Sequence, residues 1–315
     1  MTKNISNIHP ELRNLVRFVP PMPVSRYTLG LLRGAMRLVP GRRLPADVSI
    51  QNLEVQNTAQ RQPVRIRLYR PASLTALAPA MVWMHSGGYI MGVPEMDDAT
   101  CALYAREVGM IVVSVDYSLA PQHPYPQALE ECYAVLKWVQ KHAHAQGIDT
   151  SRIAVAGASA GGGLAAALAQ LAHDLNEVEV AFQLLLYPML DDRTSSDAGP
   201  NQSKHFIWTH QDNRFGWNAY LGNEDVTADG RRYAVPARRP KLSGLPAAWV
   251  GVGTADLFHE EDVAYAEALS RSGVDCELCV VPGAFHAFDW MAPNAAVVKA
   301  FRESQLTALR RHLLP

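Results

Sequence analysis

The sequence predicts an α/β protein built on a mostly parallel central sheet of about eight strands, flanked by helices. Continuous apolar runs recur along the chain, and each is followed by a stretch with helical spacing. Such runs are typical of strands that are buried on both faces and joined by crossover helices. The predicted strands are residues 80–84, 110–115, 152–156, 181–186, 247–253 and 277–281, and a closing helix is predicted over 294–314.

The region before the first apolar run has a different pattern. Residues 64–69 alternate apolar and basic side chains, which is typical of a half-exposed antiparallel strand near the edge of a sheet. The preceding segment 48–55 is its predicted partner. We therefore expect an antiparallel pair at one side of a sheet that is otherwise parallel.

Two segments do not follow the alternation of strands and helices. Residues 1–45 carry apolar side chains at helical spacing, and residues 191–235 are rich in aromatics. We predict a core formed by 46–190 and 236–315, with 1–45 and 191–235 forming a helical cap. The aromatic stripe has two interpretations, packing within the cap or contact with a substrate, and packing is the more common role of an apolar helix face. The candidate substrate contacts are Tyr89, Phe206, Trp208 and Phe215.

Composition excludes several classes of function. The chain has 29 Lys and Arg against 30 Asp and Glu, so it has no overall positive charge to attract nucleic acid. The apolar stretches are far shorter than the roughly 20 residues that cross a bilayer, so stable membrane insertion is not expected. Few cysteines and a polar N-terminal sequence indicate a cytoplasmic protein.

Two cysteines have a spacing that can bind zinc. Cys276 and Cys279 lie in a strand-like run, however, and strand residues three apart point to opposite faces of a sheet. No second cysteine pair lies nearby, whereas a closed zinc site needs four ligands. We therefore predict ordinary core cysteines and no metal site.

A candidate nucleophile lies between a predicted strand and a predicted helix. Gly157-Ala158-Ser159-Ala160-Gly161 has the G-x-S-x-G pattern, which arises by chance in roughly one chain of this length in ten. Its position is more informative, because a serine on a sharp strand-to-helix turn exposes its hydroxyl above the sheet. The overlapping G-x-G-x-x-A of a dinucleotide site begins at Gly161, too far beyond the strand for that function.

A glycine loop follows the predicted strand 80–84. In His85-Ser86-Gly87-Gly88-Tyr89, the two glycines allow a substrate carbonyl to approach the backbone closely. We predict that the N–H groups of Gly87, Gly88 and Ala160 form an oxyanion hole, in which one donor is worth roughly 2.7 to 4 kcal/mol of transition-state stabilisation. An ordinary glycine turn is the alternative.

Partners for the serine follow two later strands. Asp256 comes after the strand 247–253, and His286 comes after the strand 277–281, so nucleophile, acid and base have the chain order of the α/β-hydrolase fold. The other histidines fit less well, because His259 lies next to Asp256 and His142, His144 and His173 fall on predicted helix surfaces. The predicted triad is Ser159, His286 as base and Asp256 as the acid that orients it.

These motifs resemble the hormone-sensitive-lipase-like branch of the α/β-hydrolases, the bacterial family IV esterases. The resemblance extends from about residue 45 to the C-terminus. It rests on the glycine loop, where the family has His-Gly-Gly-Gly, on 116–126, where the family has Asp-Tyr-Arg-Leu-Ala-Pro-Glu, and on the residues around Ser159, Asp256 and His286. The chain departs from the family at Ser86, where a positive φ would be costly for serine, at Gln122 and at Ala158.

The resemblance implies a carboxylesterase that acts on short- to medium-chain esters without a cofactor. It also implies a helical cap and a homodimer. Amidases, lactonases and acyltransferases would use the same residues. A receptor that has lost catalysis is an alternative from another class, although such proteins usually lack one member of the triad, whereas all three are present here.

Overall fold

The computed structural model describes residues 5–18, 24–38, 45–56, 62–74, 76–195, 205–222 and 232–315. Its centre is an eight-stranded sheet with the order β1-β2-β4-β3-β5-β6-β7-β8. The strands are β1 (Val48–Val55), β2 (Val64–Pro71), β3 (Ala78–Met84), β4 (Ile111–Val115), β5 (Ile148–Ala158), β6 (Phe182–Leu186), β7 (Ala247–Gly253) and β8 (Cys276–Val281). The predicted fold class, an α/β-hydrolase fold with a mostly parallel sheet, is confirmed.

The antiparallel part of the sheet lies where the sequence predicts it. β1 pairs with β2 along its whole length, from Val48 opposite Pro71 to Val55 opposite Val64, and β2 pairs antiparallel with β4. The remaining neighbours are parallel. β1 is an exposed edge strand, whereas β2 is largely buried because it lies between β1 and β4. Its Arg65 and Arg67 side chains bind carboxylates of Glu95, Asp116 and Asp98.

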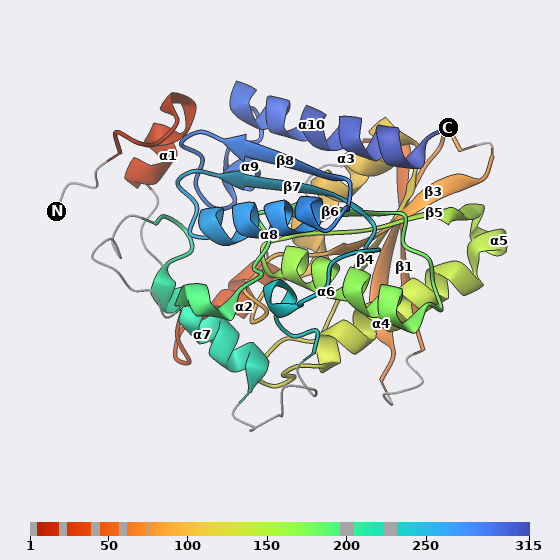
Figure 1. Ribbon diagram of the computed structural model, residues 1–315, viewed down its shortest axis with the longest axis horizontal. Coiled ribbons are helices and arrows are strands. Elements are labelled where there is room, and N and C mark those ends of the chain that lie inside the picture. The colour runs from red at the N-terminus through yellow and green to blue at the C-terminus, as the bar shows by residue number, and fades with distance from the viewer. Residues whose placement is uncertain are drawn as a thin grey trace.

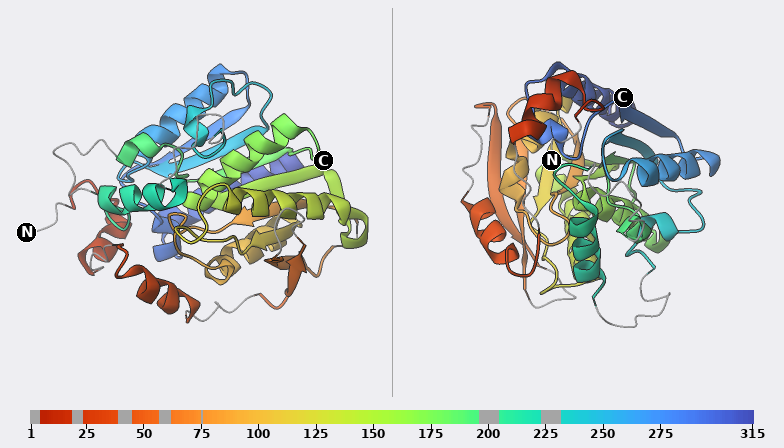
Figure 2. Two further views of the ribbon diagram at one scale, coloured as in Figure 1. Left: turned by 90° about the horizontal axis from the view of Figure 1, so that it is seen from below. Right: turned by 90° about the vertical axis from the view of Figure 1, so that its left-hand side faces the viewer.

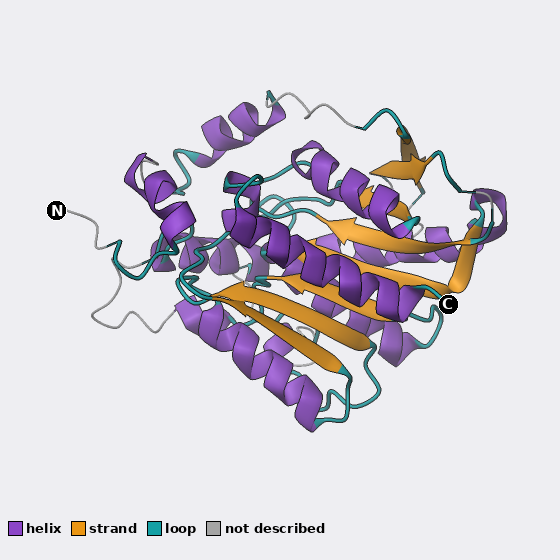
Figure 3. Cartoon of the chain, turned by 90° about the horizontal axis from the view of Figure 1, so that it is seen from above, coloured by secondary structure: helices purple, strands orange, loops and turns teal. Residues whose placement is uncertain are grey.

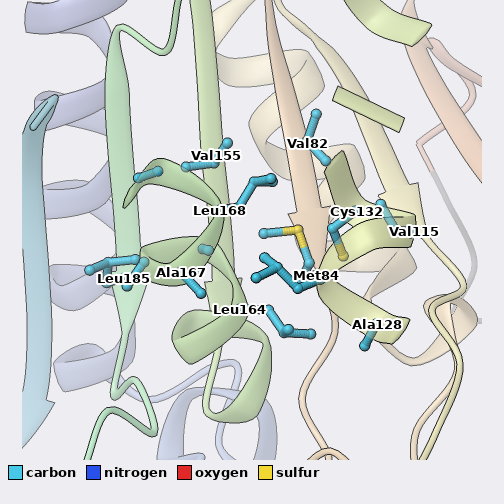
Figure 4. Packing of buried hydrophobic residues seen from close by; sticks show 14 of the residues in the cluster. Val82, Met84, Val115, Ala128, Cys132, Val155, Leu164, Ala167, Leu168 and Leu185 are labelled. Carbon is cyan, nitrogen blue, oxygen red and sulfur yellow. The ribbon is translucent and has the colours of Figure 1, made fainter. Parts of the chain in front are cut away.

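Helices cover both faces of the sheet (Figures 1 and 3). One face packs against α4, α6 and α8, and the other packs against α3 and α10. Figure 4 shows the first of these interfaces, where Leu164 and Leu168 of α6 face Val82 and Met84 of β3. The helices are α3 (Asp98–Val108), α4 (Gln127–Lys141), α5 (Ala143–Gln146), α6 (Ala160–Leu175), α8 (His259–Arg271), α9 (Phe288–Met291) and α10 (Ala296–Leu313).

The two predicted cap segments contain helices that lie outside these layers. They are α1 (Arg13–Phe18), α2 (Leu29–Arg37) and α7 (His210–Leu221). Figure 1 shows them at the end of the molecule toward which β7 and β8 point. Parts of both segments, residues 1–4, 19–23, 39–44, 196–204 and 223–231, lie outside the described residues.

The cysteines have the environments of core residues. Cys276 packs with the cluster on one face of the sheet and Cys279 with the cluster on the other. The expectation that these two side chains point to opposite faces is confirmed. Cys101 and Cys132 are fully buried, and each of the four is a free thiol.

Candidate active site

Ser159 lies on a sharp turn between β5 and α6. Its φ of 56° and ψ of −122° are unfavourable for a residue with a side chain, and its N–H is fixed by the carbonyl of Leu186 at 2.9 Å. The flanking glycines are required by space, since a Cβ on Gly157 would lie 2.3 Å from the carbonyl oxygen of Gly161, and one on Gly161 would lie 2.1 Å from that of Met84. The turn therefore holds the hydroxyl above the carboxyl edge of the sheet.

Three loops at this edge bring the predicted triad together. His286 Nε2 lies 2.9 Å from Ser159 Oγ, and His286 Nδ1 lies 2.9 Å from Asp256 Oδ2. Asp256 Oδ1 also accepts a hydrogen bond from the N–H of Phe258 at 3.0 Å, which orients the carboxylate. All three side chains are at least nine-tenths buried. This arrangement can move a proton from the hydroxyl to the imidazole while the carboxylate stabilises the positive ring.

The imidazole is also held by two aromatic rings that the sequence analysis missed. Tyr187 and Phe258 both contact the His286 ring edge to face, with centroid distances of 4.9 Å and 5.1 Å. Tyr187 has a φ of 35°, and its hydroxyl donates a hydrogen bond to Asp289 at 2.7 Å. Its position directly after β6, at the same edge as the serine, is the sequence signal that could have identified it.

The glycine loop lies beside the serine because β3 and β5 are neighbours in the sheet. Gly87 and Gly88 have φ values of 129° and 60°, and an added Cβ would lie 1.9 Å from the carbonyl oxygen of Met91 or 2.1 Å from the Trp208 ring. Ala160 is the first residue of α6, so its N–H has no acceptor within the helix. Ser86 is not among the residues with positive φ, so the serine in the family's first glycine position is not strained.

The segment 116–126 packs against the glycine loop. His85 is buried and its ring stacks on Tyr117 at 4.1 Å, while the Tyr117 hydroxyl donates to the carbonyl of His85. Burial lowers the pKa of His85, so the ring is neutral at neutral pH. Arg33 of α2 donates to the carbonyls of Ile90 and Ala120, and to the side chain of Gln122.

Two acids follow Asp256 at the start of α8. Glu261 accepts the N–H groups of Leu190 and Asp191 and the hydroxyl of Thr194, and burial raises its pKa to about 8. Asp262 is completely buried, and neither carboxylate oxygen has a hydrogen-bond partner in the described structure. Burial, followed by the charges of Glu261 and Asp256, raises the pKa of Asp262 well above its ordinary value. Burial therefore favours the protonated form of both acids.

A cavity of about 660 Å³ opens onto Ser159 and His286. Its walls are mainly apolar, with Leu32 and Met36 from α2 and Phe206 and Trp208 from the segment before α7. The buried acids Asp97, Asp212 and Asp289 also line it, and burial raises the pKa of Asp97 to about 7. No Lys or Arg is among the described lining residues.

The structure separates the four candidate substrate contacts into two pairs. Phe206 and Trp208 line the cavity, and the Trp208 ring lies against Gly88. Tyr89 does not, because its ring is buried against Tyr220 and its hydroxyl donates to the carbonyl of Met189. Phe215 packs on the core cluster instead of facing the cavity. Neither Tyr89 nor Phe215 is among the described residues that line this cavity, so a substrate contact for these two stays a prediction.

The fold and this site define the class of the protein: an α/β-hydrolase with the side-chain arrangement of a serine hydrolase. The family model described as the alpha/beta hydrolase fold matches residues 81–289. The chain belongs to this family, and within it to the hormone-sensitive-lipase-like, or family IV, esterases.

Known relatives agree with this assignment. The esterase LipI of Mycobacterium tuberculosis is 34% identical over 286 residues, which are 89% of this chain and 87% of that protein. The ethyl acetate hydrolase of Pseudomonas putida is 33% identical, over 79% of this chain and 78% of its own. The structure of a bacterial heroin esterase superposes with a TM-score of 0.88 and 34% identity, over 99% of both chains. The protein is a carboxylic-ester hydrolase.

None of the helices in the described part of the chain has the length and hydropathy needed to span a bilayer. The same residues contain no group of three or more His, Cys, Asp or Glu side chains arranged to hold a metal ion.

Proposed function

We propose that the protein hydrolyses short- to medium-chain carboxylic esters through a covalent acyl-enzyme on Ser159. The observation that carries this proposal is the continuous chain of contacts from Ser159 through His286 to Asp256, with 2.9 Å at each step. A buried hydroxyl in contact with a buried imidazole–carboxylate pair is the arrangement that activates a serine for attack on an ester carbonyl.

In the proposed reaction His286 Nε2 accepts the hydroxyl proton as Ser159 Oγ bonds to the ester carbonyl carbon. The resulting oxyanion accepts hydrogen bonds from the N–H groups of Gly87, Gly88 and Ala160. His286 then gives its proton to the leaving alcohol, and the acyl group stays on Ser159. A water that loses its proton to His286 releases the acid and restores the serine.

The size and the mainly apolar walls of the cavity support small, uncharged acyl and alcohol groups. We propose that 24–38 and 205–222 act as the cap, because Leu32, Met36, Phe206 and Trp208 enclose the space above the serine. A volume of about 660 Å³ is within the range of pockets that bury a small organic molecule. The activity named for the Pseudomonas putida relative, hydrolysis of ethyl acetate, is consistent with a short-chain substrate.

The decisive experiment compares the unchanged protein with Ser159→Ala on p-nitrophenyl esters of increasing acyl length. We expect the variant to lose roughly 10⁵- to 10⁶-fold in kcat, as removal of a serine nucleophile does in other enzymes. A fluorophosphonate should label the unchanged protein once and the variant not at all. Equal rates from the two proteins would reject the mechanism. Saturable ester binding without turnover would favour the receptor alternative, and faster turnover of matched amides or lactones would change the substrate class.

A further inference from the structure

One segment near the N-terminus carries positive charge without any acidic residue within it. Residues 12–46 contain seven arginines and no acidic residue, although the net charge of the whole chain is only −1. Within the described structure, Arg13, Arg17, Arg26, Arg33 and Arg37 form no ion pair with a carboxylate. Elsewhere in the described part most arginines do, as at Arg65, Arg239 and Arg310. The segment is therefore an uncompensated cationic surface.

Large apolar side chains are exposed on the same segment. Tyr27, Leu31 and Leu38 are 78%, 78% and 82% exposed, the highest values among the large hydrophobic residues in the described structure. Leu31 and Leu38 are seven residues apart, so they lie on the same side of α2. The exposed Arg26 and Arg37 flank this side, and we call Arg26, Tyr27, Leu31, Arg37 and Leu38 the α2 surface.

The α2 surface is directly connected with the catalytic cavity. Leu32 and Met36, on another side of the same helix, line the cavity that contains Ser159. Ile207 and Trp290 also line it and are each 40% exposed, so the cavity mouth is apolar as well. Figure 2 (left) shows α1 and α2, coloured red, along the outer margin of the molecule.

We propose that the α2 surface docks onto the surface of an anionic lipid membrane and so places the mouth of the catalytic cavity against lipid-dissolved esters. Exposed leucine and tyrosine side chains enter the boundary between headgroups and acyl chains, while long arginine side chains reach the phosphates. Anionic lipid complements the uncompensated charge, and each arginine near such a surface contributes roughly a five-fold increase in binding. Burial, followed by the charge of Arg37, lowers the pKa of Arg33.

The physical alternatives are weaker for this surface. A nucleic acid would use the arginines, but the exposed leucines would gain nothing from a phosphate backbone. A single amphipathic helix with few apolar residues binds membranes reversibly, so the proposal describes a peripheral contact and no inserted segment. The docking itself does not depend on the proposed hydrolysis, whereas its use in substrate delivery does.

The test measures binding of the catalytically inactive Ser159→Ala form to sedimenting vesicles. One set of vesicles consists of phosphatidylcholine alone, and the other of equal parts phosphatidylcholine and phosphatidylglycerol. We expect binding to the anionic vesicles, weakened at least ten-fold by Arg26→Gln with Arg37→Gln, and similarly by Leu31→Gln with Leu38→Gln. Raised salt should reduce binding through the arginines.

Matched controls use exposed residues of the same types elsewhere on the chain. Leu77→Gln with Leu175→Gln removes two exposed leucines, and Arg271→Gln with Arg311→Gln removes two exposed arginines. Neither pair should change vesicle binding. Each of the four double variants is also made in protein that retains Ser159. These proteins should hydrolyse soluble p-nitrophenyl acetate at the same rate as the unchanged protein, which shows that they fold.

Several results would overturn the proposal. Absence of binding to anionic vesicles at low salt would do so, as would equal losses in the α2 variants and their controls. A dimer in lipid-free buffer that only the α2 variants dissociate would assign this surface to a second copy of the chain. Loss of ester hydrolysis with retained vesicle binding would count against the proposed function instead.

Discussion

The carboxyl edge of the sheet and the α2 segment differ in the burial and pairing of their polar side chains. At the sheet edge, Asp256 and His286 are almost fully buried, and each has a partner at hydrogen-bond distance. On α2, charged and apolar side chains stand exposed together, and none of the arginines meets a carboxylate in the described structure. The buried, paired side chains at the sheet edge hold a few reactive atoms in fixed positions, whereas the exposed side chains of α2 are available for contact with another surface.

The largest expected effect comes from replacing Asp256 at the carboxyl edge of the sheet. We expect Asp256→Asn to lower kcat roughly 10⁴-fold on every ester, because the amide can no longer stabilise the positive imidazole. Steady-state kinetics on short and longer p-nitrophenyl esters measure this. A large change in KM with kcat intact would place Asp256 in substrate binding instead.

A methyl group added to the glycine loop should lower kcat, whereas one added to α2 should not. Gly88→Ala places a Cβ 2.1 Å from the Trp208 ring at a φ of 60°, which displaces the oxyanion loop, so we expect a loss of about 10²- to 10³-fold in kcat. Gly34→Ala on α2 meets nothing within 4 Å and should leave kcat unchanged. Thermal unfolding of both variants shows whether any loss comes from misfolding. Similar kcat values for the two variants would contradict the oxyanion assignment.

In the described structure the buried carboxylate of Asp262 has no hydrogen-bond partner, unlike those of Asp256 and Glu261. Because its pKa is raised in the folded protein, the folded state keeps a proton that the unfolded state loses above about pH 4. The free energy of unfolding should therefore fall by about 1.4 kcal/mol for each pH unit above 4, until the folded-state pKa is passed.

The measurement compares Asp262→Asn, which cannot titrate, with the unchanged protein by urea unfolding. We expect the variant's stability relative to the unchanged protein to be greater at pH 7 than at pH 5. Because Glu261 contributes to the raised pKa of Asp262, the comparison reports the titration of this coupled pair. The same stability difference at both pH values would show that Asp262 is ionised in the folded state.

The smallest predicted effect concerns the cavity wall formed by α2. Met36→Ala removes a side chain that lines the cavity without touching the triad, and we expect several-fold faster hydrolysis of longer acyl esters relative to acetate. The rate on p-nitrophenyl acetate should change less than about two-fold. An equal loss on all chain lengths would mean that α2 supports the triad and does not shape substrate preference.

Much of the fold follows from local pattern. Apolar runs buried on both faces predicted the parallel strands, and the alternating run before them predicted the antiparallel pair β1 and β2. Strand ends were less accurate, as β5 begins at Ile148 and not at residue 152. Ser159, His286 and Asp256 could be named as a candidate triad because each follows a strand, and the carboxyl ends of parallel strands meet at one edge.

Contacts between distant segments could not be predicted from such patterns. Tyr89 and Phe215 look like substrate contacts in sequence, yet one is buried against Tyr220 and the other packs on the core. Tyr187 and Phe258 contact the His286 ring. The position of Tyr187 directly after β6 could have suggested this contact, whereas no local pattern marks Phe258. Side-chain direction depends on the neighbours that folding supplies.

The sequence by itself determined the order of strands along the chain, the family, and the three residues placed after strand ends. It also determined that the segment 12–46 contains seven arginines and no acidic residue. Only the tertiary structure decided which side of α2 lines the cavity, which aromatics reach it, and that Asp262 is buried without a partner. These features depend on packing between residues far apart in the chain, which no short-range pattern specifies.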